Sequence, residues 1–373
     1  MDKPPPSMEE RLTRLLHHRS EGLTRGEAIG LPIQHTSAFY LPDDPRDGDY
    51  SYTRDGNPTW TGVEAQLSIL EAAPALTFPS GMAAISAIML TELRPGDTFI
   101  MPSDGYYGVR AFAAEVLVPF GIKVVHWPTA DYANAPLGGA KLVFIESPSN
   151  PGLDACDIAA LTARAHEAGA RVAVDNTTMT PLLQQPLDLG VDLVAVSDTK
   201  AMSGHGDVLF GHVASRDAEA MKRIATWRKV SGAIPGPAEA ALVHRGLETL
   251  EVRLDRMCDT AGTIAPRLVA HAAVRDVRYP GLVDDPSHDL LAQHARGFGF
   301  IIGFCLADKA AAERFLAACT AVTSATSFGS VHTSADRRAR WGESVDDGFI
   351  RLSVGCEPVE PLWADIERAL GAI

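Results

Sequence analysis

The chain has 373 residues, 46% of them hydrophobic and 21% charged, which is the composition of a globular protein with room for two domains. A formal net charge of −14 argues against nucleic acid as a partner, because a phosphate backbone attracts basic surfaces. No stretch approaches the ~18 consecutive apolar residues of a membrane span, and residues 1–18 contain no apolar signal core. Five widely separated cysteines without a CxxC pair fit free thiols, so we expect a cytoplasmic protein.

The N-terminal part of the chain predicts a short helix followed by an extended segment. Residues 10–18 have helical character, whereas residues 22–56 are rich in Pro, Gly and Asp and show little periodicity. We expect this segment to be an arm rather than a domain. The predicted organisation is an extended N-terminal arm at residues 1–45, a large domain at 46–246 and a small domain at 247–373.

From about Ser80 onward, apolar strands alternate with helices. This alternation predicts a largely parallel sheet covered by helices on both faces. The predicted elements are a helix at 79–93, strands at 97–103 and 140–146, a helix at 158–169, and strands at 171–175 and 191–197.

After about Leu247 the pattern changes to that of a smaller α+β unit. Its predicted elements are a long helix at 251–272, a Gly-interrupted strand at 296–307, a helix at 310–319, a strand at 349–356 and a closing helix at 361–373.

Polar side chains follow four of the predicted strands of the large domain, at the point where each strand ends. They are an aromatic pair ending in Tyr107, the amide of Asn150, the carboxylate of Asp175 and the amine of Lys200. Ligands of an open parallel sheet bind at the carboxyl ends of its strands. The pattern therefore predicts one site at this edge of the sheet.

This set of groups suits an aldehyde cofactor that carries a phosphate. A lysine can form a Schiff base with the aldehyde. A helix that opens at Gly81 and Met82 offers free N–H groups to the phosphate, and glycine permits a close approach. A carboxylate can keep a pyridine nitrogen protonated, and an aromatic ring can stack on the pyridine. Together, Lys200, Asp175, Tyr107 and the cradle of Gly81, Met82, Ser197 and Thr199 predict pyridoxal phosphate.

Other interpretations of the same residues remain open at this point. A lysine after a strand can be purely structural, and Asp175 before Asn176 could cap a helix. A nucleotide-binding α/β protein would also place a Ser/Thr/Gly loop after a strand. No metal is predicted, because the histidines lack a ligand spacing such as HExxH.

A longer series of motifs adds a resemblance to a known family. Residues 172–211, VAVDNTTMTPLLQQPLDLGVDLVAVSDTKAMSGHGDVLFG, resemble the cofactor-lysine signature of the pyridoxal-phosphate enzymes of cysteine and methionine metabolism. YSYTRDGNPT, FPSGMAAI, DGYYG, ESPSNP, YPGL and RLSVGCE follow the order of that family, from about Pro32 to the end of the chain. These trans-sulfuration enzymes include cystathionine γ-lyase, to which the chain is most similar, cystathionine β-lyase, cystathionine γ-synthase and methionine γ-lyase.

The resemblance implies a fold and an assembly. It implies the PLP-dependent transferase fold of type I, which is aspartate aminotransferase-like, with a mostly parallel seven-stranded sheet in the large domain. It also implies a homotetramer, a dimer of dimers, in which Tyr52 and Arg54 reach the phosphate in the neighbouring subunit.

The resemblance also implies roles for individual residues. Lys200 matches the Schiff-base lysine, Asp175 the partner of the pyridinium nitrogen and Tyr107 the stacking tyrosine, and these three are the expected catalytic residues. Arg351 matches the arginine that binds the substrate α-carboxylate. The phosphate cup matches Gly81, Met82, Ser197 and Thr199, and the substrate lining matches Asn150 and Ser327.

One segment departs from the family pattern and leaves the reaction open. In TSFGSVHT, residues 326–333, Thr326 stands where a glutamate tied to the distal amino group of cystathionine is frequent, and Ser330 and His332 also depart. The expected activity is γ-elimination of cystathionine to cysteine, 2-oxobutyrate and ammonia. The β-lyase, γ-synthase and methionine γ-lyase reactions are the alternatives, and an inactive cofactor-binding homologue is the alternative outside enzymes.

Overall fold

The computed structural model describes residues 6–44 and 48–373. Its larger sheet has seven strands in the order β1-β7-β6-β5-β4-β2-β3. The strands β2 to β6 pair in parallel, whereas β7 runs antiparallel to both β1 and β6. The bounds are β1 Ala75–Phe78, β2 Thr98–Pro102, β3 Lys123–Trp127, β4 Ala140–Glu146, β5 Arg171–Asp175, β6 Leu193–Val196 and β7 Gly211–Ala214.

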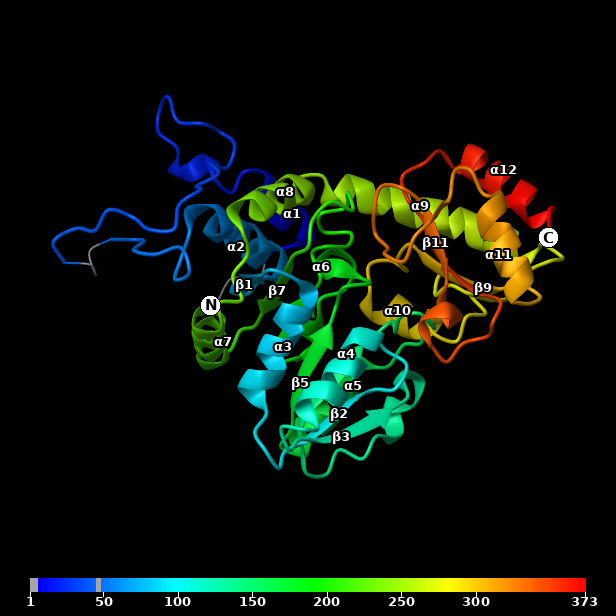
Figure 1. Ribbon diagram of the computed structural model, residues 1–373, viewed down its shortest axis with the longest axis horizontal. Helices are drawn as coiled ribbons and strands as arrows, with labels where there is room; N and C mark the ends of the chain where they lie inside the picture. The colour runs from blue at the N-terminus through cyan, green and yellow to red at the C-terminus, as the bar shows by residue number, and fades with distance from the viewer. Residues whose placement is uncertain (1–5, 45–47) are drawn as a thin grey trace.

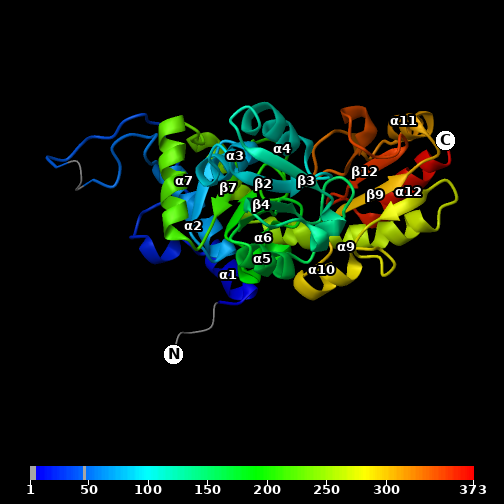
Figure 2. The same ribbon diagram turned by 90° about the horizontal axis from the view of Figure 1, so that it is seen from below.

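Helices cover both faces of this sheet, as the alternation of elements predicted (Figures 1 and 2). Because side chains alternate along a strand, β4 sends Leu142 and Phe144 into one core and Val143 and Ile145 into the other. The helices are α1 Met8–Leu16, α2 Pro58–Glu71, α3 Gly81–Glu92, α4 Tyr107–Phe112, α5 Ile158–Glu167, α6 Thr180–Leu183, α7 Ala218–Ser231 and α8 Pro237–Leu247.

A smaller mixed sheet lies towards the C-terminus, in the order β10-β11-β12-β9-β8. Its β10–β11 pair is parallel and its other pairs are antiparallel. A third core joins it to three of the helices that follow α8 (Figure 1). The elements are α9 Leu250–Val269, β8 Arg275–Arg278, α10 His288–His294, β9 Ile301–Cys305, α11 Lys309–Ala318, β10 Thr323–Ser324, β11 Ser334–Arg337, β12 Phe349–Ser353 and α12 Val359–Leu370.

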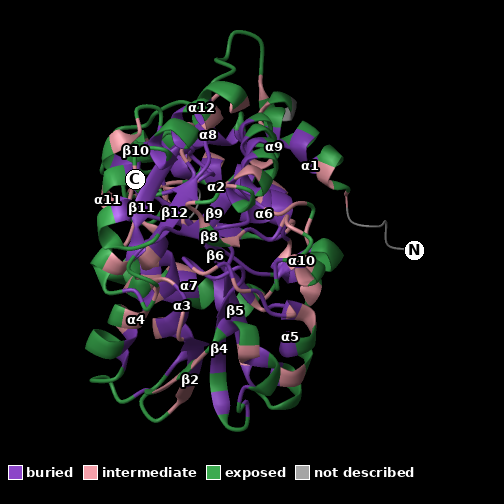
Figure 3. Cartoon of the chain, turned by 90° about the vertical axis from the view of Figure 1, so that its right-hand side faces the viewer, coloured by how far each residue is buried: buried purple, intermediate pink, exposed green. Residues whose placement is uncertain are grey.

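The fold agrees with the predicted class. Elements that were not predicted individually include β1, β3, β7, β8, β10 and β11, and the elements that were predicted differ from the structure at their ends. The strand predicted at 296–307 begins only at Ile301, since Gly299 has a φ of +78° that a regular strand does not use. Tyr107, expected in a polar loop, is the first residue of α4. Buried residues concentrate in the centre of the molecule, and exposed ones lie on the outer helix faces (Figure 3).

The described part of the segment at residues 22–56, called the arm from here on, extends away from the body of the molecule, whereas α1, which precedes it, packs on the core through Leu12 and Leu15 (Figure 1). Several of its apolar side chains are exposed: Ile29 is 83% and Tyr40 100% accessible. Among the described residues of this segment, a single bridge, between Ala38 and Tyr52, pairs strand-like backbone. The expected boundary between residues 45 and 46 falls outside the described residues. Among those described, no helix combines the length and apolar character needed to cross a bilayer.

Candidate active site

A cavity of about 320 Å³ lies between the carboxyl ends of the central strands and the segment 326–351 of the smaller sheet. It is at the position where an open α/β sheet binds its ligands. Its lining comprises Ser80, Gly81, Met82, Ile85, Tyr106, Tyr107, Glu146, Asn150, Asp175, Thr177, Thr178, Ser197, Thr199, Lys200, Leu209, Thr326, Ser327, Phe328, Arg338 and Arg351.

One end of the cavity is an anion cradle at the start of α3. Ser80 caps this helix, since its hydroxyl accepts a hydrogen bond from Ala83 N at 3.1 Å. The first N–H groups of a helix have no partner within it, so those of Gly81 and Met82 can bind an anion. A Cβ at Gly81 would lie 2.5 Å from Ser197 Cβ, so only glycine allows the two segments this close.

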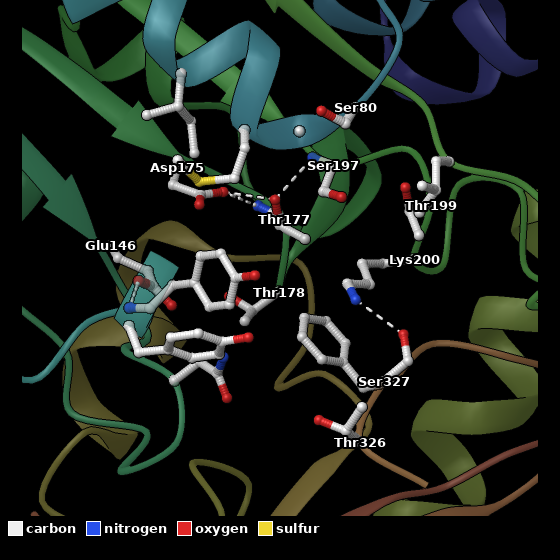
Figure 4. A pocket seen from close by; sticks show the side chains of 18 of the residues that line it. Ser80, Glu146, Asp175, Thr177, Thr178, Ser197, Thr199, Lys200, Thr326 and Ser327 are labelled. Atoms are coloured by element: carbon white, nitrogen blue, oxygen red, sulfur yellow. Dashed lines mark hydrogen bonds between the residues drawn. The ribbon is translucent and has the colours of Figure 1, made fainter. Parts of the chain in front are cut away.

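Asp175 ends β5 and is buried. Its Oδ1 accepts hydrogen bonds from Thr177 N at 3.0 Å and from Thr177 Oγ1 at 2.5 Å (Figure 4). Burial raises the pKa of Asp175, while these hydrogen bonds and the charge of Lys200 oppose the rise. Asp175 is not the cap of α6, whose N-cap is Met179. Its carboxyl group is therefore available to a cationic partner in the cavity.

Lys200 follows β6 on a turn that closes with a hydrogen bond from its own N–H to Ser197 O at 3.1 Å. Its Nζ donates to Ser327 Oγ at 2.8 Å and lies 5.0 Å from the centre of the Phe328 ring (Figure 4). Burial, followed by the charge of Arg351, lowers the pKa of Lys200 to about 8. Near neutral pH the uncharged amine, which is the form that attacks an aldehyde, is therefore far more populated than in an ordinary lysine.

This lowered pKa can be measured on the protein without cofactor. Competitive labelling with acetic anhydride, followed by peptide mass spectrometry, should give Lys200 a reactivity midpoint near pH 8. An ordinary lysine titrates at about 10.4. Arg351→Gln removes one cause of the shift, so the midpoint should move upward in that variant. A midpoint of Lys200 near 10 in the wild type would contradict the described environment.

A buried charge cluster supports the turn that carries Lys200. His212 on β7 hydrogen-bonds through Nδ1 to Asp198 at 2.8 Å and through Nε2 to Glu71 at 3.1 Å, and all three are fully buried. Burial alone would lower the pKa of His212, but the two carboxylates outweigh it and raise that pKa to about 10. Because Asp198 stands between Ser197 and Thr199, the cluster fixes this turn against β7.

Removal of His212 should strongly destabilise the protein. His212→Gln leaves two buried carboxylates without their cation, which costs about 3–5 kcal/mol of unfolding free energy. The folded pKa of about 10 exceeds the unfolded value, so this contribution is complete below about pH 6.5 and disappears as the pH rises through 10. Urea unfolding of both proteins should therefore show the wild-type advantage shrinking from pH 7 to pH 10. If the difference in unfolding free energy between the wild type and His212→Gln stayed constant from pH 7 to pH 10, His212 would not be charged in the folded protein.

Two tyrosines form the wall beside Asp175. The ring of Tyr107 lies 4.9 Å from that of Tyr106, edge to face, and Tyr107 is 43% exposed. Burial, followed by the proximity of Tyr107, raises the pKa of Tyr106 to about 12. Tyr106 N donates to Glu146 Oε2 at 2.6 Å, which places the start of α4 at the end of β4. Burial also raises the pKa of the Glu146 carboxyl well above its ordinary value.

Arg351 reaches the cavity from β12 and is buried. Its Nη1 donates to Asn150 Oδ1 at 2.7 Å, and its Nη2 donates to the carbonyl oxygens of Thr326 and Ser327. Burial, then the charge of Arg338, lowers the pKa of Arg351 to about 9. Its Nε is buried without a hydrogen-bond partner in the protein. These acceptors are neutral, so the guanidinium is prepared for an anionic ligand.

The structure brings together all but two of the predicted site residues. Gly81, Met82, Tyr107, Asn150, Asp175, Ser197, Thr199, Lys200, Ser327 and Arg351 all line the cavity. Tyr52 and Arg54 do not. They lie on the arm, where the Arg54 guanidinium is 5.5 Å from the centre of the exposed Tyr52 ring.

Sequence reasoning missed several lining residues. Glu146 was inside the ESPSNP motif, at the end of a predicted strand, and could have been named from its position. Thr177 stands two residues after Asp175. At this spacing its hydroxyl and its N–H can both donate hydrogen bonds to the Asp175 carboxylate. Arg338 lies in a segment without periodicity, where the only signal is three arginines within four residues, 337–340.

The cavity fits pyridoxal phosphate on the observations above. It holds an amine with a lowered pKa, a buried carboxylate and a helix-terminal cradle that a Cβ at Gly81 would fill. Together with the seven-stranded sheet, this set defines a pyridoxal-phosphate-dependent enzyme of fold type I.

Comparisons with known proteins agree. The Cys/Met metabolism PLP-dependent enzyme family matches residues 12–371. A Streptomyces coelicolor protein provisionally named cystathionine gamma-lyase is 48% identical over 93% of this chain and 93% of its own length. The cystathionine beta-lyase of Bacillus subtilis is 37% identical over 97% and 96%, respectively. The crystal structure of cystathionine gamma synthase from Xanthomonas oryzae pv. oryzae in complex with cystathionine has a TM-score of 0.94 at 34% identity, over 99% of both chains.

The chain therefore belongs to the family of PLP-dependent enzymes of cysteine and methionine metabolism. These relatives carry the names of three different reactions, so membership establishes the cofactor and the trans-sulfuration chemistry but not the particular reaction.

Proposed function

We propose that the protein is a carbon–sulfur lyase that cleaves cystathionine by γ-elimination, yielding cysteine, 2-oxobutyrate and ammonia with consumption of one water. The observation that carries the proposal is the convergence of Lys200, Asp175 and Arg351 on one cavity. The 48% identical relative supports the γ-lyase assignment. The cofactor, when bound, supplies an electron sink that makes the Cα–H bond of the substrate acidic.

The chain's own residues have distinct tasks in this proposal. Lys200, with its low pKa, holds the cofactor and then carries a proton to and from the substrate. Asp175 keeps the ring nitrogen cationic, and the N–H groups of Gly81 and Met82 with the hydroxyls of Ser197 and Thr199 bind the phosphate. Tyr107 stacks on the ring and acts as acid or base near the departing sulfur.

The substrate is held by groups of the opposite wall. Arg351 binds the α-carboxylate, and the hydrogen bond from its Nη1 to Asn150 Oδ1 fixes its plane. Ser327 presents its hydroxyl 2.8 Å from the amine of Lys200, beside the position of the substrate amino group. These contacts orient the Cα–H bond towards Lys200.

A second copy of the chain completes the site in this proposal. Tyr52 and Arg54 are exposed on a projecting arm and lie outside their own cavity, which supports a role at the phosphate of a neighbouring subunit. The exposed apolar side chains of the arm support its burial in an interface, within the predicted homotetramer. The described cysteines are free thiols, which suits the predicted cytoplasmic location.

Product identification tests the reaction. Cystathionine should give 2-oxobutyrate and cysteine, whereas pyruvate and homocysteine would indicate β-elimination instead. Consumption of O-acylhomoserine and cysteine to form cystathionine would indicate a γ-synthase, and faster release of methanethiol from methionine a methionine γ-lyase. A protein that is coloured by bound cofactor but turns over none of these substrates would be an inactive cofactor-binding homologue.

A further inference from the structure

The cavity contains one more guanidinium group than recognition of an α-carboxylate requires. Arg338 begins a short 3₁₀-helix, residues 338–341, and its side chain lines the cavity although it is almost fully buried. Its Nη1 lies 3.3 Å from Thr326 Oγ1, and the carbonyl of the same threonine accepts a bond from Arg351. The two arginines therefore both contact Thr326, Arg338 through its hydroxyl and Arg351 through its carbonyl.

Arg338 is tied to the wall that carries the tyrosines. Arg110, three residues after Tyr107 on α4, donates to Glu343 Oε2 at 2.8 Å. The other oxygen of Glu343 accepts from Arg338 Nη2, also at 2.8 Å. This chain of ion pairs crosses from the larger to the smaller sheet. It ties the Arg338 guanidinium to α4, the helix that begins at Tyr107, and in the proposed function Tyr107 acts near the departing sulfur.

The ion pairs around Arg338 occupy only two of its three nitrogen atoms. Asp336 accepts from Arg338 Nη1 at 2.9 Å and Glu343 from Nη2 at 2.8 Å, while the neighbouring Arg340 pairs with Glu313 at 3.1 Å. In addition, Arg338 Nε is buried without any hydrogen-bond partner in the protein. A buried donor without a partner costs free energy, and an anionic ligand would supply that partner.

We propose that Arg338 is a specificity-determining residue that binds a carboxylate on the leaving group of the substrate. The site then selects substrates whose departing thiol carries a carboxylate, as cysteine does when it leaves cystathionine, over thioethers with a neutral leaving group. This inference rests on the proposed γ-elimination. It gives the second arginine a role separate from that of Arg351, which binds the α-carboxylate that every amino-acid substrate shares.

A matched pair of substrates isolates the carboxylate. S-(2-carboxyethyl)-L-homocysteine and S-propyl-L-homocysteine differ only by a carboxylate in place of a methyl group, and both release 2-oxobutyrate on γ-elimination. The wild type should prefer the first in kcat/KM by about 10- to 100-fold, the range for a hydrogen bond to a charged group. Arg338→Gln should lose that preference, because kcat/KM falls more for the carboxyethyl substrate than for the propyl substrate. Arg338→Lys should retain part of the preference, because the positive charge remains.

Two further variants separate this role from a structural one. Arg351→Gln should slow both substrates equally, since it removes the α-carboxylate contact. Arg337→Gln removes the neighbouring charge, which pairs with Glu313 outside the cavity, and should keep the wild-type preference. An equal loss on both substrates in Arg338→Gln, or a wild type indifferent to the carboxylate, would overturn the role of Arg338 while the proposed function stands.

If the wild type cleaves neither substrate of the pair, product identification with cystathionine still decides on the proposed function, and binding of the pair decides on Arg338. Dissociation constants for the pair can be followed by the absorbance of the bound cofactor. Tighter binding of the carboxylate substrate to the wild type but not to Arg338→Gln would support the assignment. Equal binding of both substrates to the wild type would reject it.

Discussion

Lys200→Ala should abolish turnover, with kcat falling by at least about 10⁴-fold while the fold is retained. Lys200 is the only lysine among the residues that line the described cavity, and the other cationic groups there are guanidinium groups. A guanidinium neither adds to an aldehyde nor gives up a proton near neutral pH. No other lining side chain can therefore take over both tasks proposed for the amine.

The structure also predicts what this variant should keep. The side chain of Lys200 makes one hydrogen bond, to Ser327, so the free energy of unfolding should change by about 1 kcal/mol or less. Kinetics with cystathionine and urea unfolding measured on the same preparation separate the two effects. Lys222→Ala, at an exposed position of α7, is the control and should behave as the wild type. Wild-type rates in Lys200→Ala would refute the assignment, whereas partial recovery with added small amines would support it.

The large sheet and the cofactor end of the cavity could be predicted from the sequence because local patterns determine them. Residues 172–174 and 193–196 are apolar because both faces of the sheet are covered, and the polar residues at the ends of these strands must meet at one edge. Asp175 and Lys200 therefore lie at the same edge of the sheet, regardless of the conformations of the loops that follow the strands. The family resemblance then added roles that composition and spacing had left open.

The substrate end was harder to predict because it depends on contacts distant in sequence. Arg338 is held at the cavity by an ion pair with Glu343. Glu343 also pairs with Arg110, which lies 233 positions earlier in the chain. No periodicity marks the segment 338–341, and a buried arginine cannot be told from an exposed one by its sequence neighbours. The same holds for His212, whose partners Asp198 and Glu71 lie on a turn and a distant helix.

Asp175→Asn should lower kcat by about 10²- to 10³-fold, the usual cost of removing one preorganised electrostatic group from an active site. The amide oxygen of asparagine can still accept the two hydrogen bonds from Thr177, so the geometry at the end of β5 should persist. What is lost is the negative charge, and with it the stabilisation of a cationic ring nitrogen. Steady-state kinetics with cystathionine measure the effect, and the absorbance of bound cofactor shows whether the site is still loaded.

Glu146→Gln provides the matched comparison for this charge, because Glu146 is a second buried carboxyl in the same cavity. Burial raises the pKa of Glu146 well above its ordinary value, which favours the neutral acid, so its conversion to an amide changes the charge much less. The amide oxygen can still accept the hydrogen bond from Tyr106 N. We therefore expect a loss of less than about 10-fold for Glu146→Gln, since a neutral group contributes less than a charged one. Equal losses in the two variants would mean that the shape of the cavity, and not the charge of Asp175, is what the reaction requires.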